Sequence, residues 1–241
     1  MEVIFFMTMG LILLGIMMLA LFFEVGRSAF RGLGLSTIGA FMVILAFAIG
    51  IIVPSISFGG VFYMNVGGFI LPILAMFVLL VVLIRNNAVL RGVAAMLSVV
   101  AATVGLLLIM PVNNTGMIVL TSFVLGLISG ALAFIIGRTR VASLFAVTGG
   151  IAVGDVIFCL LDYFVITGGA FTLGRVVVYN SIFVAALFAL CLAEIVVMTG
   201  KAMGEERTNK RNLNFEASED RAFKSKLSDD DDYDRFDDEL F

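Results

Sequence analysis

Long apolar stretches, separated by short connections, run through most of this 241-residue chain. A helix needs about 20 apolar residues to cross the hydrocarbon core of a bilayer, because every backbone N–H and C=O group must be satisfied within the helix there. Seven stretches are long enough, and they predict an all-α, polytopic bundle of about seven transmembrane helices. They cover residues 3–23, 33–53, 61–84, 92–110, 116–136, 141–161 and 176–199.

Arginine is distributed unevenly among the connections between these stretches. The second connection, 54–60, and the fourth, 111–115, carry no charge, and the sixth holds only Asp162 and Arg175. The odd connections hold all the other arginines that precede residue 200, namely Arg27, Arg31, Arg85, Arg91, Arg138 and Arg140. Short loops rich in Arg and Lys stay in the cytoplasm. The alternation therefore predicts an N-terminus outside the cell and a cytoplasmic C-terminus.

Composition agrees with a membrane environment for most of the chain. Hydrophobic residues make up 61% and charged residues 14%, whereas soluble domains are about 45–50% apolar and about 25% charged. Residues 1–199 hold seven arginines and five acidic residues, but residues 200–241 hold eight basic and thirteen acidic ones. Acidic runs repel themselves and resist folding. We expect a transmembrane helical domain, 1–199, and a disordered acidic cytoplasmic tail, 200–241.

The tail has two interpretations. Its acidic run, 229–239, is typical of a solvated segment that keeps a protein soluble. Alternatively, Tyr233, Phe236 and Phe241 anchor the tail on a cytoplasmic protein partner. Binding by the isolated tail would separate the two.

Three polar side chains fall at one depth in three different predicted helices. Asp155 lies about 21 Å from the cytoplasmic end of the sixth helix, and Asn65 and Asn180 lie about 6 Å below the outer surface in the third and seventh. Asp162 is two turns beyond Asp155, and Arg175 enters the seventh helix nearby. Ionisable side chains within a bilayer are expensive and often functional. The five residues form either an outward-facing polar vestibule for a substrate or, with Asp155 paired to Arg175 or to the asparagines, a structural link between helices.

Small and sulfur-bearing residues have simpler expected roles. Gly150 and Gly154 have the spacing that lets two membrane helices approach closely. Cys159 and Cys191 lie in apolar runs at different depths, so we expect them to pack and not to form a disulfide.

Catalytic groups are scarce in this sequence. Histidine is absent and no lysine precedes Lys201, which excludes histidine-dependent intramembrane proteases, zinc sites of the H-E-x-x-H type and retinal Schiff bases. A Gly-Asp protease could use Asp155, but it needs a second aspartate close by, and Asp162 is about 10 Å further along the helix. We therefore predict no enzyme activity, no cofactor, no metal and no nucleic-acid partner.

The segment Asn65-Val66-Gly67-Gly68, soon followed by Pro72, resembles a segment of an uncharacterised prokaryotic integral-membrane family, domain of unknown function 1614. The later order of a proline-containing loop, a glycine-rich helix with Asp and a glycine-rich entry to the last helix is similar too. The resemblance covers roughly residues 33–194 and implies a multi-pass protein of the prokaryotic cytoplasmic membrane. Where that family tends to have Asp-Gly-Ile-Phe, this chain has Asn180-Ser181-Ile182-Phe183, so a second intramembrane carboxylate is missing.

Two functions from different classes remain open. A small-solute or ion carrier would use the outward polar cluster. A non-catalytic scaffold or regulatory membrane protein would act through its acidic cytoplasmic tail. Both have the lipid bilayer as a partner. Replacing Asp155 with Asn should abolish a carrier, and deleting residues 200–241 should abolish the scaffold.

Overall fold

The computed structural model describes residues 15, 42–43, 45–47, 49–50, 53, 55–60, 62–110, 114–166 and 171–199. The chain divides into two compact units, Met1–Glu194 and Ile195–Phe241. The helices and the sheet discussed here pack within the first unit. The described part of the second is the end of the last helix, where Thr199 Oγ1 donates to the Ile195 carbonyl oxygen at 2.8 Å. The predicted first span, 3–23, and the predicted tail, 200–241, lie outside the described residues, Gly15 apart.

Five described helices are long and apolar enough to cross a membrane, as expected for a multi-pass membrane protein. Large apolar side chains also point outward from the bundle, for example Leu74, Phe77 and Val78 on one helix, which suits contact with lipid tails. The predicted second span is described only in part, and its described residues from Met42 to Gly50 are helical. The five helices are Val66–Arg85, Val89–Ile109, Gly116–Gly137, Arg140–Ile166 and Val176–Thr199.

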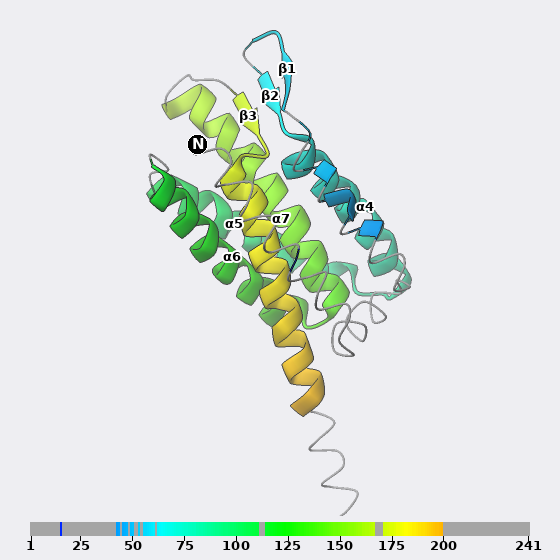
Figure 1. The fold of residues 1–241 in the computed structure, drawn as a ribbon. Helices are drawn as coiled ribbons and strands as arrows, with labels where there is room; N and C mark the ends of the chain where they lie inside the picture. The colour runs from blue at the N-terminus through cyan, green and yellow to red at the C-terminus, as the bar shows by residue number, and fades with distance from the viewer. Residues whose placement is uncertain are drawn as a thin grey trace, which may run out of the picture. The chain divides into compact units, whose positions relative to one another are not determined.

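The helices run back and forth between two ends (Figure 1). The π-helical turn η1 (Val66–Ile70) leads directly into α4 (Leu71–Arg85), which is followed by α5 (Val89–Ile109), α6 (Thr115–Gly137) and α7 (Arg140–Leu161). A second π-helical turn, η2 (Asp162–Ile166), extends α7. The last helix, Val176–Thr199, has the bounds that the sequence predicts. The spans predicted at 92–110, 116–136 and 141–161 are likewise confirmed as helices, each within three residues of its bounds.

Side chains at the helix starts explain where two of these helices begin. Asn114 Oδ1 accepts a hydrogen bond from the backbone N–H of Met117 at 2.9 Å, and Thr139 Oγ1 accepts one from Ala142 at 3.2 Å. Such N-caps satisfy backbone donors that have no partner within the helix. They fix the starts of α6 and α7 at short connections.

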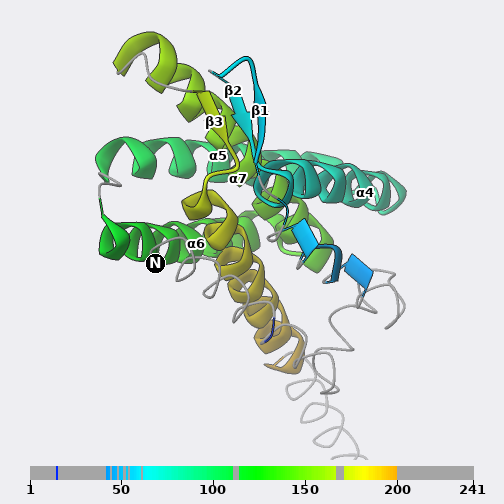
Figure 2. The same ribbon diagram turned by 45° about the horizontal axis from the view of Figure 1, so that its top comes forward.

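Three short strands correct the purely helical prediction. β1 (Ile56–Phe58) pairs antiparallel with β2 (Phe62–Met64), and β2 pairs parallel with β3 (Phe171–Leu173). A turn through Gly59 and Gly60, both with positive φ, joins β1 to β2, a conformation that glycine adopts without strain. The predicted third span, 61–84, is therefore wrong at its start, because residues 62–64 belong to a strand. Figure 2 shows the three strands together at one end of the bundle.

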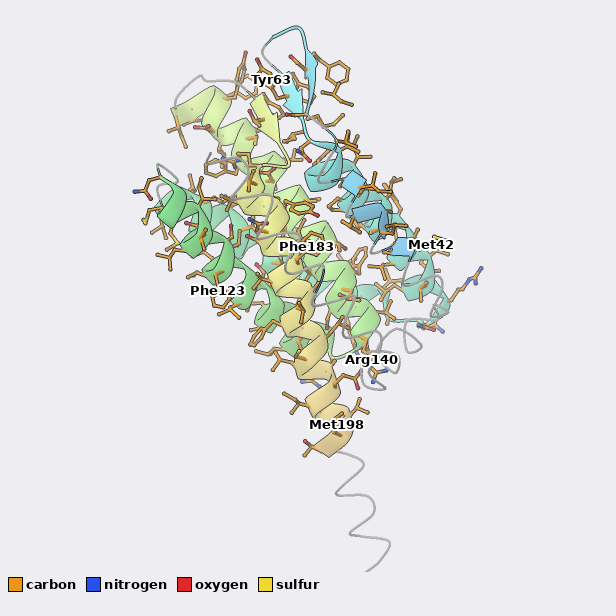
Figure 3. All side chains as sticks on the ribbon, in the orientation of Figure 1. Met42, Tyr63, Phe123, Arg140, Phe183 and Met198 are labelled. Atoms are coloured by element: carbon orange, nitrogen blue, oxygen red, sulfur yellow. The ribbon has the colours of Figure 1, made fainter. Side chains whose placement is uncertain are left out.

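The two ends of the first unit differ in character. The sheet end carries β1, β2 and β3, and Tyr63 marks it in Figure 3. The arginine end, where Figure 3 labels Arg140, holds the turns after α4 and α6, and Arg85, Arg91, Arg138 and Arg140 lie in or beside these turns. The described parts of the second and sixth predicted connections thus meet at the sheet end, and the third and fifth meet at the arginine end.

Helix α7 lies at the centre of the packing. Most of its side chains are buried, including Ala146, Val147 and Ile151. A Cβ on Gly150 would lie 2.7 Å from Val99 of α5, and one on Gly154 would lie 2.7 Å from the Cβ of Thr103. The prediction that this glycine pair serves close helix packing is therefore confirmed. The close approach of α5 and α7 keeps the segment of α7 around these glycines inside the bundle.

Candidate functional site

The Asp155 side chain is fully buried in the bundle interior. Arg175 donates to Asp155 Oδ1 through Nη2 at 2.9 Å and through Nε at 3.3 Å. The backbone N–H of Gly174 donates to Oδ2 at 2.8 Å. Both carboxylate oxygens thus have donors, and the charge of Asp155 is balanced by a guanidinium, as a buried charge requires. We call this arrangement, formed by Asp155, Gly174 and Arg175, the carboxylate clamp.

The Arg175 side chain connects the clamp to the surface. Its guanidinium carbon lies 4.5 Å from the centre of the Phe158 ring, a cation–π geometry. The Arg175 side chain is 28% exposed, whereas the Asp155 side chain is 0% exposed. Arg175 therefore covers the carboxylate on the side that faces out of the bundle.

A single peptide unit joins the clamp to Asn65. The Leu173 carbonyl oxygen accepts from the Asn65 backbone N–H at 3.1 Å, and the N–H of the next residue, Gly174, donates to Asp155. These two bonds put the Asn65 backbone nitrogen within about 8 Å of the carboxylate, given the bond lengths of a peptide unit. The backbone of Asn65 is thus linked to Asp155 through this one peptide unit.

Gly68 and Gly174 make this junction possible. Gly174 has φ +70°, and a Cβ on it would lie 2.7 Å from the Gly68 carbonyl carbon. A Cβ on Gly68 would in turn overlap the Gly174 carbonyl oxygen. Two backbones pass each other here without side chains between them, so η1 can rest directly on the clamp.

The Asn65 side chain bonds to the backbone of its own segment. Its Oδ1 accepts a hydrogen bond from the Gly68 backbone N–H at 2.8 Å and caps the start of η1. An amide oxygen committed to an N-cap stabilises its own helix start. The Asn65 side chain is therefore used in the cap of η1, and the hydrogen bond from it to Asp155 that the sequence offered as one alternative is not formed.

Asn180 makes no hydrogen bond with the clamp. Its side chain is fully buried, and neither Nδ2 nor Oδ1 has a hydrogen-bond partner among the described residues. Thr121 Oγ1 is also buried without such a partner. The pairing of Asp155 with Asn180, one of the alternatives that the sequence offered, is therefore not formed, since Gly174, Arg175 and Cys159 supply the donors to that carboxylate.

An apolar cluster lies about one helical turn from Asn180, and it indicates which residues share the level of Asn180 in the bundle. Leu107, Phe158 and Val177 pack together with Ile118, and each comes from a different helix near the sheet end. Since a helical turn takes 3.6 residues, the next turn on α5, α6 and the last helix presents buried polar side chains. We call these the polar layer: Thr103, Thr121, Ser122, Asn180 and Ser181.

Most hydroxyls of the polar layer bond to their own helix. Thr103 donates to the Val99 carbonyl oxygen at 2.8 Å, and Ser122 and Ser181 likewise donate to carbonyls four residues earlier. Gly154 of α7 meets Thr103 directly. The amide of Asn180 and the hydroxyl of Thr121 are the members whose hydrogen-bonding capacity the described residues leave unused.

Two further residues lie at this end of the bundle. One was predicted as a site residue, and the role of the other was overlooked. Asp162, a predicted site residue, begins η2 and is half-buried. Cys159 has more than a packing role, because its thiol lies 2.9 Å from the Thr172 carbonyl oxygen and 3.8 Å from Asp155 Oδ1. The four-residue spacing from Asp155 places both side chains on one helix face, a signal that the sequence already contained.

The described residues hold no group of three or more His, Cys, Asp or Glu side chains placed to bind a metal ion. Comparison with known proteins gives no match to a family model, a curated protein or a solved structure. The resemblance to domain of unknown function 1614 stays a prediction.

Proposed function

We propose that this multi-pass protein carries a small polar solute or ion across the membrane, and that the polar layer is where the solute binds. The observation that carries this proposal is the Asn180 side chain, fully buried and without a partner among the described residues. An unpaired buried polar group costs about 1–3 kcal/mol. A solute with a donor and an acceptor would supply the missing hydrogen bonds.

The carboxylate clamp suits the role of a gate above the polar layer. Asp155 is one residue from Gly154, which packs on Thr103 of that layer. Separating Arg175 from Asp155 would remove the cover of the carboxylate and expose a charge at the mouth of the bundle. A cationic or hydrogen-bond-donating solute could then replace Arg175 at Asp155, as ion pairs within membranes do on substrate pathways.

The orientation that we propose keeps seven helices, an outer N-terminus and a cytoplasmic C-terminus in a prokaryotic cytoplasmic membrane. It is supported by the position of Arg85, Arg91, Arg138 and Arg140 at one end of the bundle, since such residues stay on the cytoplasmic side. The sheet end and the clamp would then face outward.

Cysteine accessibility tests the carrier without knowledge of its solute. Asn180→Cys should react with a small methanethiosulfonate reagent added from outside, and adding Arg175→Gln should speed the reaction because it opens the clamp. Ala185→Cys is the matched control, since Ala185 is equally buried five residues further along the same helix. If Asn180→Cys reacts no faster than Ala185→Cys in either background, the polar layer is not reached and the carrier proposal is wrong.

A scaffold or regulatory protein that acts through tail 200–241 is the second candidate. It is favoured by the clamp itself, because both oxygens of Asp155 have donors and the cluster can serve structure alone. Asp155→Asn should then leave function intact while deletion of residues 200–241 abolishes it. A carrier predicts the reverse, so a cellular phenotype scored for both variants distinguishes them.

A further inference from the structure

A pocket of about 570 Å³ opens at the arginine end of the bundle. It lies between the turn that joins α4 to α5 and the start of α7, and its polar lining comes from Asn86, Asn87, Arg91, Thr139 and Arg140. Small-ligand sites occupy roughly 300–1,000 Å³. The pocket is therefore large enough for a small molecule or a lipid headgroup.

The lining of this pocket is positively charged. Arg91 is exposed, and no acidic side chain lines the pocket. Arg140, labelled in Figure 3, is 2.6 Å from Glu194, so its charge is largely balanced and Arg91 supplies most of the positive charge of the lining. The pocket consequently favours an anion.

Two helix starts add to this charge. The N-termini of α5 and α7 both border the pocket, and neither helix has an acidic residue in its first turn. Ala88 precedes α5 and provides no side-chain cap. Helix N-termini carry partial positive charge and free N–H groups, which bind phosphate and similar anions.

The donors match a phosphate group better than a carboxylate. A guanidinium binds two phosphate oxygens with a planar pair of N–H groups, and the amides of Asn86 and Asn87 can serve the remaining oxygens. Leu90, at the pocket and 85% exposed, offers an apolar surface beside it. We propose that this pocket binds the phosphate group of an anionic ligand, carried by a lipid headgroup or by a soluble phosphate ester. The proposal does not depend on the carrier function.

Binding to the full-length chain in neutral detergent tests the proposal. The probes are phosphatidylglycerol, phosphatidylcholine with the same acyl chains, and inorganic phosphate, each titrated by calorimetry or native mass spectrometry. Arg91→Gln should weaken binding about tenfold, because hydrogen bonds to charged groups are among the stronger ones. Arg91→Lys should weaken it less, since it keeps the charge but loses the planar pair of donors.

Arg85→Gln is the matched control. Arg85 ends α4 at the same end of the bundle and is exposed, but it does not line the pocket. Its replacement should change affinity less than about twofold, as expected for an exposed, screened charge that is not part of the pocket lining. Because Arg91 and Arg85 are both exposed, neither variant should impair folding, which circular dichroism can verify.

The probes also distinguish the two sources of phosphate. A lipid ligand requires that phosphatidylglycerol bind more tightly than phosphatidylcholine and that inorganic phosphate fail to displace it. A soluble ligand requires that inorganic phosphate bind the wild-type chain and not Arg91→Gln. The proposal is overturned if no probe binds, or if Arg85→Gln weakens binding as much as Arg91→Gln.

Discussion

Arg175 at the sheet end and Arg91 at the arginine end of the bundle are used in opposite ways. At the sheet end, Arg175 is held by a buried carboxylate and an aromatic ring, and a peptide unit seals the junction with η1. At the arginine end, Arg91 is exposed beside a pocket that no acidic side chain lines. An arginine beside a buried acid therefore closes the bundle, whereas an arginine without one leaves it open to a ligand. The number of arginines at an end matters less.

Labelling from outside intact cells gives the largest expected difference between the two ends. Ser57→Cys on β1 should react fully with an impermeant maleimide, and Arg138→Cys should not react until the membrane is opened, because arginine-rich turns stay inside. Both positions are exposed. The exposed Cys191 is replaced by alanine beforehand. Labelling of Arg138→Cys alone would reverse the proposed orientation.

Arg175→Leu should be the most destabilising single substitution at the sheet end. It leaves the Asp155 carboxylate buried without its cation, a change that typically costs about 3–5 kcal/mol. The free energy of unfolding in detergent, followed by circular dichroism, measures the loss.

The double variant Asp155→Leu with Arg175→Leu is the control for this prediction. It removes both charges, so it should recover most of the stability that Arg175→Leu loses. A loss below about 1 kcal/mol for Arg175→Leu, the range of exposed pairs, would mean that the clamp is not a buried ion pair.

Gly68→Ala should have an intermediate effect. The added Cβ would lie 2.8 Å from the Gly174 carbonyl carbon, so η1 would have to move away from the clamp, and such overpacking costs about 1–3 kcal/mol. Gly105→Ala is the matched control, since a Cβ there meets no atom within 4 Å. That variant should gain about 0.5–1 kcal/mol from helix propensity. Equal thermal stability of the two variants would refute the close backbone contact.

Asn180→Leu should cause the smallest loss of stability, or none. The amide has no partner among the described residues, so an apolar side chain removes the cost of about 1–3 kcal/mol of an unpaired buried polar group and should not lower the unfolding free energy. Urea titration of the purified protein would measure it. A loss of several kcal/mol would reveal a structural partner for Asn180 and weaken the case that it serves a solute.

The helical part of the fold was predictable because long apolar runs have few alternatives in a bilayer. The predicted start of α5 came three residues late, since Arg91 was treated as part of a connection although α5 begins at Val89. A long arginine side chain near a helix end can extend to the interface while its backbone stays helical. The number of spans before residue 62 is a prediction that the described residues do not test.

The strands were not predictable from spacing. Each has three residues, and Phe62 and Phe171 stack with ring centres 5.2 Å apart, so apolar side chains at the strand resemble the start of a membrane span. The pairing of β2 with β3 joins segments that are distant in sequence. The spacing of apolar residues within one segment does not indicate which distant strand it will pair with.

The residues of the candidate site were predictable from the sequence, but most of the contacts that they make were not. The Asp155–Arg175 pair is one of the alternatives that the sequence offered, and the structure shows it. The role of Asn65 as an N-cap depends on backbone geometry at η1, and the role of Gly174 depends on its positive φ. Neither property is visible in residue spacing.

The position of Arg175 in the chain has a consequence for biogenesis. Asp155 leaves the ribosome twenty residues ahead of the arginine that neutralises it. The sequence separation between β2 and its partner strand β3 is larger still. While a chain is inserted from its N-terminus onward, the sixth predicted span therefore enters the bilayer with an uncompensated acid and an unfinished sheet. A stall in translation between these residues would leave Asp155 without its cation and β2 without β3.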